Sequence, residues 1–314
     1  MPNSNTGELP KRQLGSTGLF VHPIGVGCAP LGSMPDTMGY TVDEEQALAT
    51  LRAAFAEPIN FIDTAGLYGD GEAERRIGIV LREMGGLPPG FVLATKAGRN
   101  PQTLEYYDAK GIRASVERSL RLLGLDRLQM LYLHGPDRTT WEWVNAPGGP
   151  LEAFVQLKRE GIAEHLGVAG GATDVLLRYL DLDLFEVVLT HNHYNLLSVD
   201  AGPVLDVATK KGLGVVNAAP YGSGILAKGP DEYPRFRYEE ASPEIIERAR
   251  LIQAVCRRYD VPLAAVALQF SLRDPRITST VAGMTKPERV AQTVEYAKMA
   301  IPEPLWEELR PLIG

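Results

Sequence analysis

Three polar side chains stand at the ends of short apolar segments in the first half of the sequence, and a tyrosine lies near one of them. Asp63, Lys96 and His134 each end such a segment, and Tyr68 closely follows Asp63. Each residue alone has an ordinary structural explanation, because a strand-end aspartate commonly caps a turn and a strand-end histidine commonly bonds backbone. Three such residues at successive strand ends, with Tyr68 near one of them, point instead to one site.

Proton transfer to or from an oxygen atom near neutral pH is the chemistry that this set suits. A tyrosine has an ordinary pKa of about 10, and a nearby ammonium or imidazole lowers that pKa because it stabilises the phenolate. Lys96 and His134 could act on Tyr68 in this way, and the Asp63 carboxylate could keep Lys96 charged. We therefore interpret Tyr68 as a tuned general acid and base. A Schiff-base enzyme that uses Lys96 is the alternative.

The segments that carry these residues belong to a regular alternation of short apolar runs and longer stretches of helical period. The expected strands are residues 24–27, 59–63, 91–96, 130–134, 165–169, 187–191, 214–218 and 278–282. The expected helices are residues 43–56, 72–84, 112–123, 151–160, 174–180, 204–210, 262–272 and 287–299. This unbroken order predicts an α/β fold, a (β/α)8 TIM barrel, whose chemistry lies at the carboxyl ends of the strands.

Further segments add to the barrel pattern at both ends of the chain. Residues 11–14 and 19–21, around a turn at 15–18, predict an N-terminal hairpin. Residues 243–259 and 304–312 predict extra C-terminal helices. Residues 1–10 are polar, without a secretory signal, and are expected to form a flexible tail before a single domain over residues 11–314.

Composition excludes several classes of function. The 314 residues carry a net charge of −7 and lack the basic excess that nucleic-acid binding requires. Apolar runs end long before the ~18 residues that span a bilayer, so we expect neither nucleic acid nor a membrane as partner. The two cysteines, Cys28 and Cys256, lie far apart, which argues against a disulfide framework and favours a cytoplasmic location. The sequence leaves the oligomeric state open.

The residues around the four polar positions resemble the aldo-keto reductases. Residues 60–69, 94–96 and 131–134 match that family's catalytic tetrad in order and spacing, and the likeness runs from residue 11 onward. The resemblance implies hydride transfer between a nicotinamide cofactor and a carbonyl or alcohol carbon of a small molecule. Tyr68 would be the proton donor or acceptor, with Asp63, Lys96 and His134 as its catalytic partners.

Within the family, two glycine- and alanine-rich segments narrow the resemblance. Residues 25–32 and 216–220 are most similar to the branch of aldose 1-dehydrogenases, which oxidise sugars of the L-fucose or L-galactose type to lactones, and a pyridoxal 4-dehydrogenase is similar to that branch. A general aldehyde or ketone reductase, a pyridoxal dehydrogenase and a cofactor-binding regulatory barrel are the alternatives.

The same resemblance implies a dinucleotide site along the strand ends. The positions expected to contact the cofactor are Cys28, Asp63, His191, Ala219, Tyr221, Ser223, Gly224, Leu226, Gly283, Thr285, Arg289, Gln292 and Thr293. Glycines near residue 223 would let backbone amides approach a pyrophosphate, and the helix after the last strand would place its N-terminus near a phosphate. Residues 25–30 lack the third glycine of a Rossmann fingerprint.

Several positions depart from the family's pattern. Ala169, Gly170 and His191 stand where Ser, Asn and Gln commonly hold the carboxamide of the nicotinamide. Ala218 replaces a tyrosine that commonly stacks on that ring, and Gly283 replaces a lysine that commonly meets a 2′-phosphate. We therefore expect NAD or NADP as the cofactor, with NAD preferred.

Histidines and aromatic residues near the strand ends leave two further points open. His191 and His193 form an H-x-H pair, but no cysteine and few carboxylates accompany it, so no metal is expected. Trp141, Trp143 and Tyr40 lie in predicted loops, where they could line a substrate pocket or pack on the surface.

Overall fold

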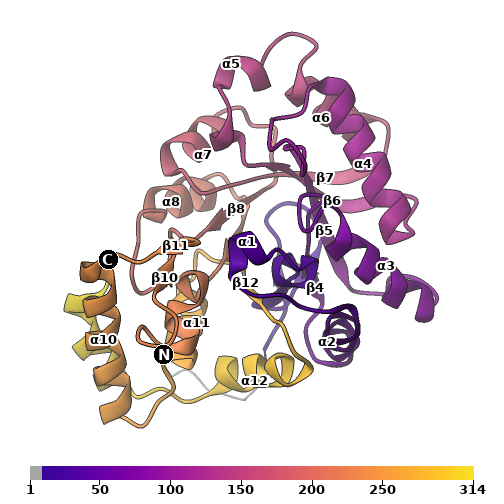
Figure 1. Cartoon of the computed structure of the whole chain (residues 1–314). Helices are drawn as coiled ribbons and strands as arrows, with labels where there is room; N and C mark the ends of the chain where they lie inside the picture. Colours follow the sequence, from indigo (N-terminus) through magenta and orange to yellow (C-terminus); the bar gives the residue numbers. More distant parts are fainter. Residues whose placement is uncertain (1–8) are drawn as a thin grey trace.

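A closed barrel of eight parallel strands forms the centre of the protein in the computed structural model, which describes residues 9–314 (Figure 1). Around the barrel the order is β12 (Ser279–Gly283), β3 (Ile24–Gly27), β4 (Phe61–Asp63), β5 (Val92–Ala97), β6 (Leu128–His134), β7 (Ala163–Gly170), β8 (Val187–His191) and β9 (Gly214–Ala218). The predicted (β/α)8 TIM barrel is confirmed, and each strand lies within a few residues of its expected bounds.

Helices follow the strands and surround the barrel (Figure 1). Those that alternate with the strands are α2 (Glu44–Ala56), α3 (Glu72–Glu83), α4 (Ala109–Leu123), α6 (Pro150–Arg159), α7 (Thr173–Leu180), α8 (Gly202–Lys210), α11 (Leu263–Leu272) and α12 (Pro287–Lys298). Two of them begin at an aspartate cap. The Asp43 side chain accepts from the backbone N–H of Gln46, and the Asp108 side chain accepts from that of Gly111. Along residues 9–314 every helix is too short or too polar to cross a membrane.

The expected additions are present at both ends of the chain. β1 (Arg12–Gln13) pairs antiparallel with β2 (Phe20–Val21), and α10 (Pro243–Arg258), α13 (Glu303–Leu309) and the 3-10 turn η4 (Arg310–Leu312) are the extra C-terminal helices. Most of the expected tail, residues 1–8, lies outside the described residues. The assignment of residues 11–314 to a single domain stays a prediction.

Short elements that the sequence did not predict all follow strands of the barrel, at their carboxyl ends, and all have four residues or fewer. They are η1 (Ala29–Gly32), α1 (Pro35–Met38), η2 (Pro136–Arg138), α5 (Trp141–Val144), η3 (Gly222–Gly224), α9 (Ile225–Lys228) and the paired strands β10 (Arg235–Phe236) and β11 (Glu239–Glu240). Segments this short show no periodicity that a sequence pattern could reveal.

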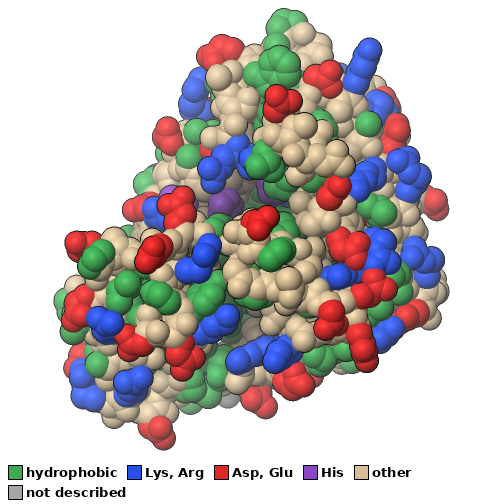
Figure 2. All heavy atoms as spheres, viewed as in Figure 1, with side chains coloured by type: hydrophobic (Ala, Val, Ile, Leu, Met, Phe, Trp, Pro, Cys, Tyr) green, Lys and Arg blue, Asp and Glu red, His purple; other side chains and the backbone are tan. Residues whose placement is uncertain are grey.

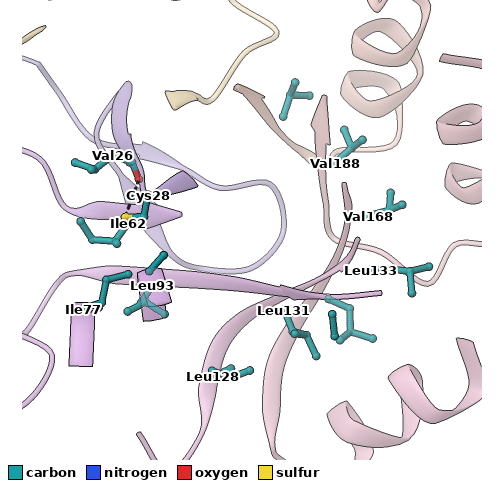
Figure 3. Close-up of a cluster of buried hydrophobic side chains, with 14 of the residues drawn as sticks. Val26, Cys28, Ile62, Ile77, Leu93, Leu128, Leu131, Leu133, Val168 and Val188 are labelled. Atoms are coloured by element: carbon teal, nitrogen blue, oxygen red, sulfur yellow. Dashed lines mark hydrogen bonds between the residues drawn. The ribbon is translucent and has the colours of Figure 1, made fainter. Parts of the chain in front are cut away.

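Alternation along each strand sorts the apolar side chains into two layers. The outer layer packs against the helices and includes Val26, Ile62, Leu93, Leu131, Val168 and Val188 (Figure 3). The inner layer fills the barrel and includes Leu14 and Val21 of the N-terminal hairpin, Phe61, Met130, Tyr132, Val187, Leu189 and Val216. Burying one large apolar side chain contributes about 1.5–3 kcal/mol. Both layers therefore fix the strand register, and with it the side chains that reach the mouth of the barrel.

Candidate active site

The carboxyl-terminal mouth of the barrel collects the residues that the sequence singled out. Asp63, Lys96 and His134 each lie two positions beyond an inner-layer residue, so alternation directs them inward at the mouth. Tyr68 reaches the same place from the loop between β4 and α3, where its hydroxyl contacts Lys96. Figure 2 shows a hollow near the middle of the face in view, with histidine side chains inside it.

Lys96 is the centre of the four side chains. Its Nζ donates to Asp63 Oδ2 at 2.7 Å, to the Thr64 carbonyl at 2.7 Å and to the Tyr68 hydroxyl at 3.2 Å. The Lys96 and Asp63 side chains are almost fully buried. Three acceptors use all three protons of the ammonium group, which leaves no free amine to attack a carbonyl. The geometry thus favours the ion-pair role of Lys96 over the Schiff-base alternative.

One close backbone approach and two side-chain hydrogen bonds hold the loop that carries Tyr68. A Cβ on Gly69 would lie 1.9 Å from the Gly32 carbonyl oxygen, and Gly69 has a φ of 63°, so only glycine fits there. Nearby, Arg76 donates to the carbonyls of Leu31 at 2.6 Å and Val42 at 3.1 Å. The loops after β3 and β4 are therefore locked together, which fixes the position of the Tyr68 ring.

The protonation of Tyr68 differs from the sequence-based expectation. Burial raises the pKa of Tyr68 well above its ordinary value, and the Asp63 carboxylate adds to the rise. Burial also lowers the pKa of His134 well below its ordinary value, with the Lys96 ammonium adding to the effect. The expected lowering of the Tyr68 pKa by Lys96 and His134 is wrong for this arrangement, because desolvation outweighs the ammonium and a neutral imidazole brings no charge. Tyr68 is a protonated acid near neutral pH.

Histidines extend the polar side of the mouth beyond Tyr68. The His134 ring stands edge-on to the Tyr68 ring, with 6.0 Å between the ring centroids. His191 ends β8, its Nδ1 has no hydrogen-bond partner within residues 9–314, and burial lowers its pKa to about 4. A Cβ on Gly171 would lie 3.3 Å from both His191 and His193. The described part of the chain holds no group of three or more potential metal-binding side chains.

Small residues line the opposite arc of the mouth. Gly27 pairs in register with Gly283 on one side and with Asp63 on the other, and Ala218 ends β9. A Cβ on Gly27 would lie 3.0 Å from Val281 Cγ1, and one on Gly283 would lie 3.0 Å from Pro30 Cγ. These positions form a low shelf beside Asp63 and beside His191, whose Nδ1 has no hydrogen-bond partner within residues 9–314. The shelf could accommodate a flat ring, and the His191 nitrogen could bond a polar substituent on that ring.

The segment after β9 has a strained backbone. Ala219 and Ser223 have φ values of 58° and 66°, in the left-handed region that non-glycine residues rarely adopt. Gly222 and Gly224 also have positive φ, and a Cβ there would lie 3.1 Å from the Phe236 ring and 2.8 Å from the Tyr233 ring respectively. The close approach of these two rings thus explains why glycines stand at these positions, and the sequence did not reveal this explanation.

The start of α12 brings together the last group of predicted cofactor positions. Arg289 is exposed and donates to the Gln292 side chain, while Thr293 is buried and donates to the Arg289 carbonyl at 2.7 Å. Tyr221 lies close enough to the Thr293 side chain for Thr293 to oppose the rise that burial causes in the pKa of Tyr221, and the Thr285 carbonyl accepts from Gln46 Nε2 at 2.6 Å. The loop after β12 and the segment after β9 therefore meet at one edge of the mouth.

Two predicted cofactor positions direct their side chains away from the mouth. Cys28 is fully buried beside Val26 and Ile62 in the outer layer (Figure 3). Leu226 is fully buried in a separate apolar cluster with Ala249 and Ile252 of α10. A ligand could therefore reach only the backbone at these two positions.

The three aromatic residues of the predicted loops have different surroundings in the structure. Trp141 packs on Tyr179, with 4.9 Å between ring centroids, and Trp143 is 48% exposed. Tyr40 lies close enough to Tyr233 and Tyr238 for both to add to the rise that burial causes in its pKa, to about 12. Sequence reasoning missed Tyr238, which also raises the pKa of Tyr68, because nothing in the pattern indicated the β10–β11 turn that carries it.

Comparisons with known proteins agree with this geometry. The sequence model of the Aldo/keto reductase family matches residues 23–313. The chain is 33% identical to D-threo-aldose 1-dehydrogenase from Pseudomonas sp, with 94% of both chains covered. It is 31% identical to pyridoxal 4-dehydrogenase from Microbacterium luteolum, with 96% of both covered, and 31% identical to L-galactose dehydrogenase from Arabidopsis thaliana, with 91% of this chain and 88% of that protein covered.

A solved structure extends the agreement to the fold. The holo form of the aldo-keto reductase AKR11C1 from Bacillus halodurans is similar with a TM-score of 0.79 and 25% identity, over 98% of this chain and 97% of that one. With the family match, this likeness settles the class of reaction. The chain belongs to the aldo-keto reductase family, as an NAD(P)-dependent oxidoreductase that acts on carbonyl and alcohol groups.

Proposed function

We propose that this protein is an aldose 1-dehydrogenase, which oxidises the anomeric carbon of a small sugar to a lactone with Tyr68 as acid and base. The observation that carries the proposal is the buried chain of contacts from Asp63 through Lys96 to the Tyr68 hydroxyl, beside the shelf of small residues. The similarity to D-threo-aldose 1-dehydrogenase and L-galactose dehydrogenase supports the choice of sugar substrates.

The nicotinamide, when bound, supplies the acceptor or donor of the hydride. The residues of the chain move the proton. In reduction, Tyr68 is already protonated and can donate to the substrate oxygen. In oxidation, Tyr68 must first lose its proton, and the Lys96 ammonium 3.2 Å from the phenol oxygen stabilises the phenolate that results.

Asp63 and His134 complete the proposed machinery. An ammonium without a partner is costly to bury, so the Asp63 carboxylate at 2.7 Å keeps Lys96 charged. His134 is neutral and lies edge-on to Tyr68, where it can hydrogen-bond the substrate oxygen and orient it.

The proposed cofactor site runs from the shelf to the edge formed by the start of α12. Asp63 and His191 would face the nicotinamide end, together with the backbone at Cys28. The remaining contacts are proposed at Ala219, Tyr221, Ser223, Gly224, Leu226, Gly283, Thr285, Arg289, Gln292 and Thr293. These positions come from the segments after β9 and β12, which approach each other through Tyr221 and Thr293.

We further propose NAD rather than NADP as the preferred cofactor. Gly283 brings no cation to the edge where a 2′-phosphate would lie, and the Arg289 guanidinium already bonds Gln292. We expect a higher kcat/KM with NAD⁺ than with NADP⁺. A strong preference for NADP⁺ would refute this part of the proposal. We also propose a cytoplasmic location for the protein. Its two cysteines, which are both buried and free, support this location.

Pyridoxal is a second candidate substrate, because the chain is as similar to pyridoxal 4-dehydrogenase as to L-galactose dehydrogenase. The two candidates differ in the chemistry that the mouth must recognise. An aldose presents several hydroxyl groups, whereas pyridoxal presents an aromatic ring. A comparison of kcat/KM for L-fucose, L-galactose and D-arabinose with that for pyridoxal separates them.

The experiment that tests the proposal is a screen of these substrates at the absorbance of the reduced nicotinamide, with both cofactors, on wild type and Tyr68→Phe. We expect aldose oxidation by wild type and a loss of about 10²–10⁴-fold in Tyr68→Phe, with cofactor affinity retained. Tyr259→Phe, outside the mouth on α10's C-terminal side, is the matched control and should behave as wild type. Turnover retained in Tyr68→Phe would refute the role of Tyr68.

A further inference from the structure

Residues 233–240, which we name the strap, pack on the segment after β9 at the edge of the barrel mouth. The strap contains β10 and β11 and lies on the same face as α1 (Figure 1). At one side, the Tyr233 hydroxyl donates to the Met38 carbonyl at 2.6 Å. At the other side, Arg237 Nη2 donates to Asp200 Oδ2 at 2.7 Å and to Ser198 Oγ at 2.9 Å. The strap therefore joins the loop after β3 to the loop after β8.

The turn of the strap is strained. Its two central residues, Arg237 and Tyr238, have φ values of 54° and 69°. A two-residue hairpin turn with both φ values positive strongly prefers asparagine and glycine, and bulky side chains pay a steric penalty there. Strain of this kind persists only where the surroundings hold it, and it clusters at functional sites. The ion pair between Arg237 and Asp200 is one such constraint.

A second constraint on the turn is a chain of hydrogen bonds from Tyr238 to the barrel. Its backbone amide donates to Ser223 Oγ at 3.0 Å, and Ser223 Oγ donates to Asn192 Oδ1 at 3.1 Å. Asn192 directly follows His191 at the end of β8, so this chain of bonds ties the turn to the barrel rim. The turn conformation is thus fixed from two independent directions, and with it the placement of the Tyr238 side chain.

Tyr238 lies near the reacting residues. Its presence adds to the raised pKa of Tyr68, and the Lys96 ammonium in turn opposes the rise that burial causes in the pKa of Tyr238. Hydrogen bonding to the Asn192 side chain opposes that rise as well. The oxygen of the Asn192 amide already accepts from Ser223, so the amide nitrogen is the group of Asn192 that can donate to the phenol oxygen. The proton of the Tyr238 hydroxyl is left to donate to a ligand.

We propose that Tyr238 determines specificity by donating a hydrogen bond to a hydroxyl group of the substrate next to the reacting carbon, and that the strap exists to present it. The proposal deepens the function proposed above and rests on it for the class of substrate. Arg237 is paired with Asp200, so its charge is compensated, and the neutral phenol of Tyr238 is the other polar group that the turn carries. A neutral, hydroxylated substrate suits such a surface better than an anionic one.

The test compares two aldehydes of equal carbon number in the reducing direction, glyceraldehyde with its hydroxyls and propanal without them. In Tyr238→Phe, the ratio of kcat/KM for glyceraldehyde to that for propanal should fall about tenfold, the size of effect that one lost hydrogen bond produces. The loss should appear mainly in KM for glyceraldehyde, and propanal should change by less than about twofold. Tyr259→Phe is the matched control.

An unchanged ratio in Tyr238→Phe overturns the proposal, and so does an equal loss with both aldehydes, because that would reflect a structural role. A wild-type enzyme that does not favour glyceraldehyde over propanal overturns it too. The test does not depend on sugar oxidation, since carbonyl reduction follows from the family. Failure of wild type to oxidise any aldose would refute the proposed function. The ratio of kcat/KM for glyceraldehyde to that for propanal would still test the role of Tyr238.

Discussion

A shift from pH 7.5 to 5.5 should destabilise the protein through the histidine at the end of β8. Burial lowers the pKa of His191 to about 4 in the folded chain. In the unfolded chain the same imidazole has an ordinary pKa of about 6.5. The unfolded state therefore binds more protons between these two values, and stability falls as the pH falls through 6.5.

The size of the effect follows from the two pKa values. At pH 5.5 the unfolded chain carries about 0.9 proton on this residue and the folded chain about 0.03. The integrated difference between pH 7.5 and 5.5 is ~1.3 kcal/mol of unfolding free energy for His191 alone. His134 and His193, whose pKa values burial also lowers, act in the same direction.

Urea unfolding of wild type and His191→Gln at both pH values measures this contribution. Glutamine keeps a polar amide at the position and does not titrate. The decline in unfolding free energy should be ~1.3 kcal/mol smaller in the variant, because the variant lacks the titration of His191. An equal decline in the two proteins, or a larger one in the variant, would show that the folded chain protonates His191 and would refute the reasoning.

Three further outcomes are expected. Asp63→Asn leaves the Lys96 ammonium buried against a neutral partner and should cost ~3–5 kcal/mol in urea unfolding; an unchanged midpoint would contradict the ion pair. Gly78→Ala would place a Cβ 1.9 Å from the Leu122 carbonyl oxygen and should cost ~1–3 kcal/mol, whereas Gly202→Ala, with open space around its Cβ position, should be nearly neutral. Since the pKa of Tyr68 is raised, kcat/KM for oxidation should rise about tenfold per pH unit from pH 7 upward while reduction stays level; an oxidation plateau below pH 8 would refute this.

The barrel could be predicted because each strand and helix follows one periodic rule over a sufficient length. The segment that became β8 is a short apolar run that ends at His191, and this run is visible in the sequence, whereas the inward Val187 and Leu189 and the outward Val188 are separated only in the structure. The strap could not be predicted in the same way. Its strands have two residues each, and its turn lacks the Asn-Gly signal of a two-residue hairpin.

Within the candidate site, residue identity could be predicted better than protonation. Position at a strand end was enough to bring Lys96 to Asp63, since the fold directs successive strand ends to one mouth. Desolvation depends on everything packed around a group, so no pattern of neighbouring residue types could reveal that burial outweighs the ammonium beside Tyr68. The outward direction of the Cys28 side chain depends in the same way on where β3 ends.

The raised pKa of Tyr68 and the ammonium beside it are compatible under the proposed function. Lys96 carries a positive charge that Asp63 balances at 2.7 Å, so the pair has little net charge to offer a neutral phenol. Once Tyr68 has given up its proton, the phenolate becomes a much stronger acceptor for the same N–H 3.2 Å away. An interaction that strengthens as charge develops lowers a barrier, whereas one that is equally strong at the start does not. Lys96 would therefore favour the phenolate that forms in oxidation, although burial keeps the pKa of the resting Tyr68 above its ordinary value.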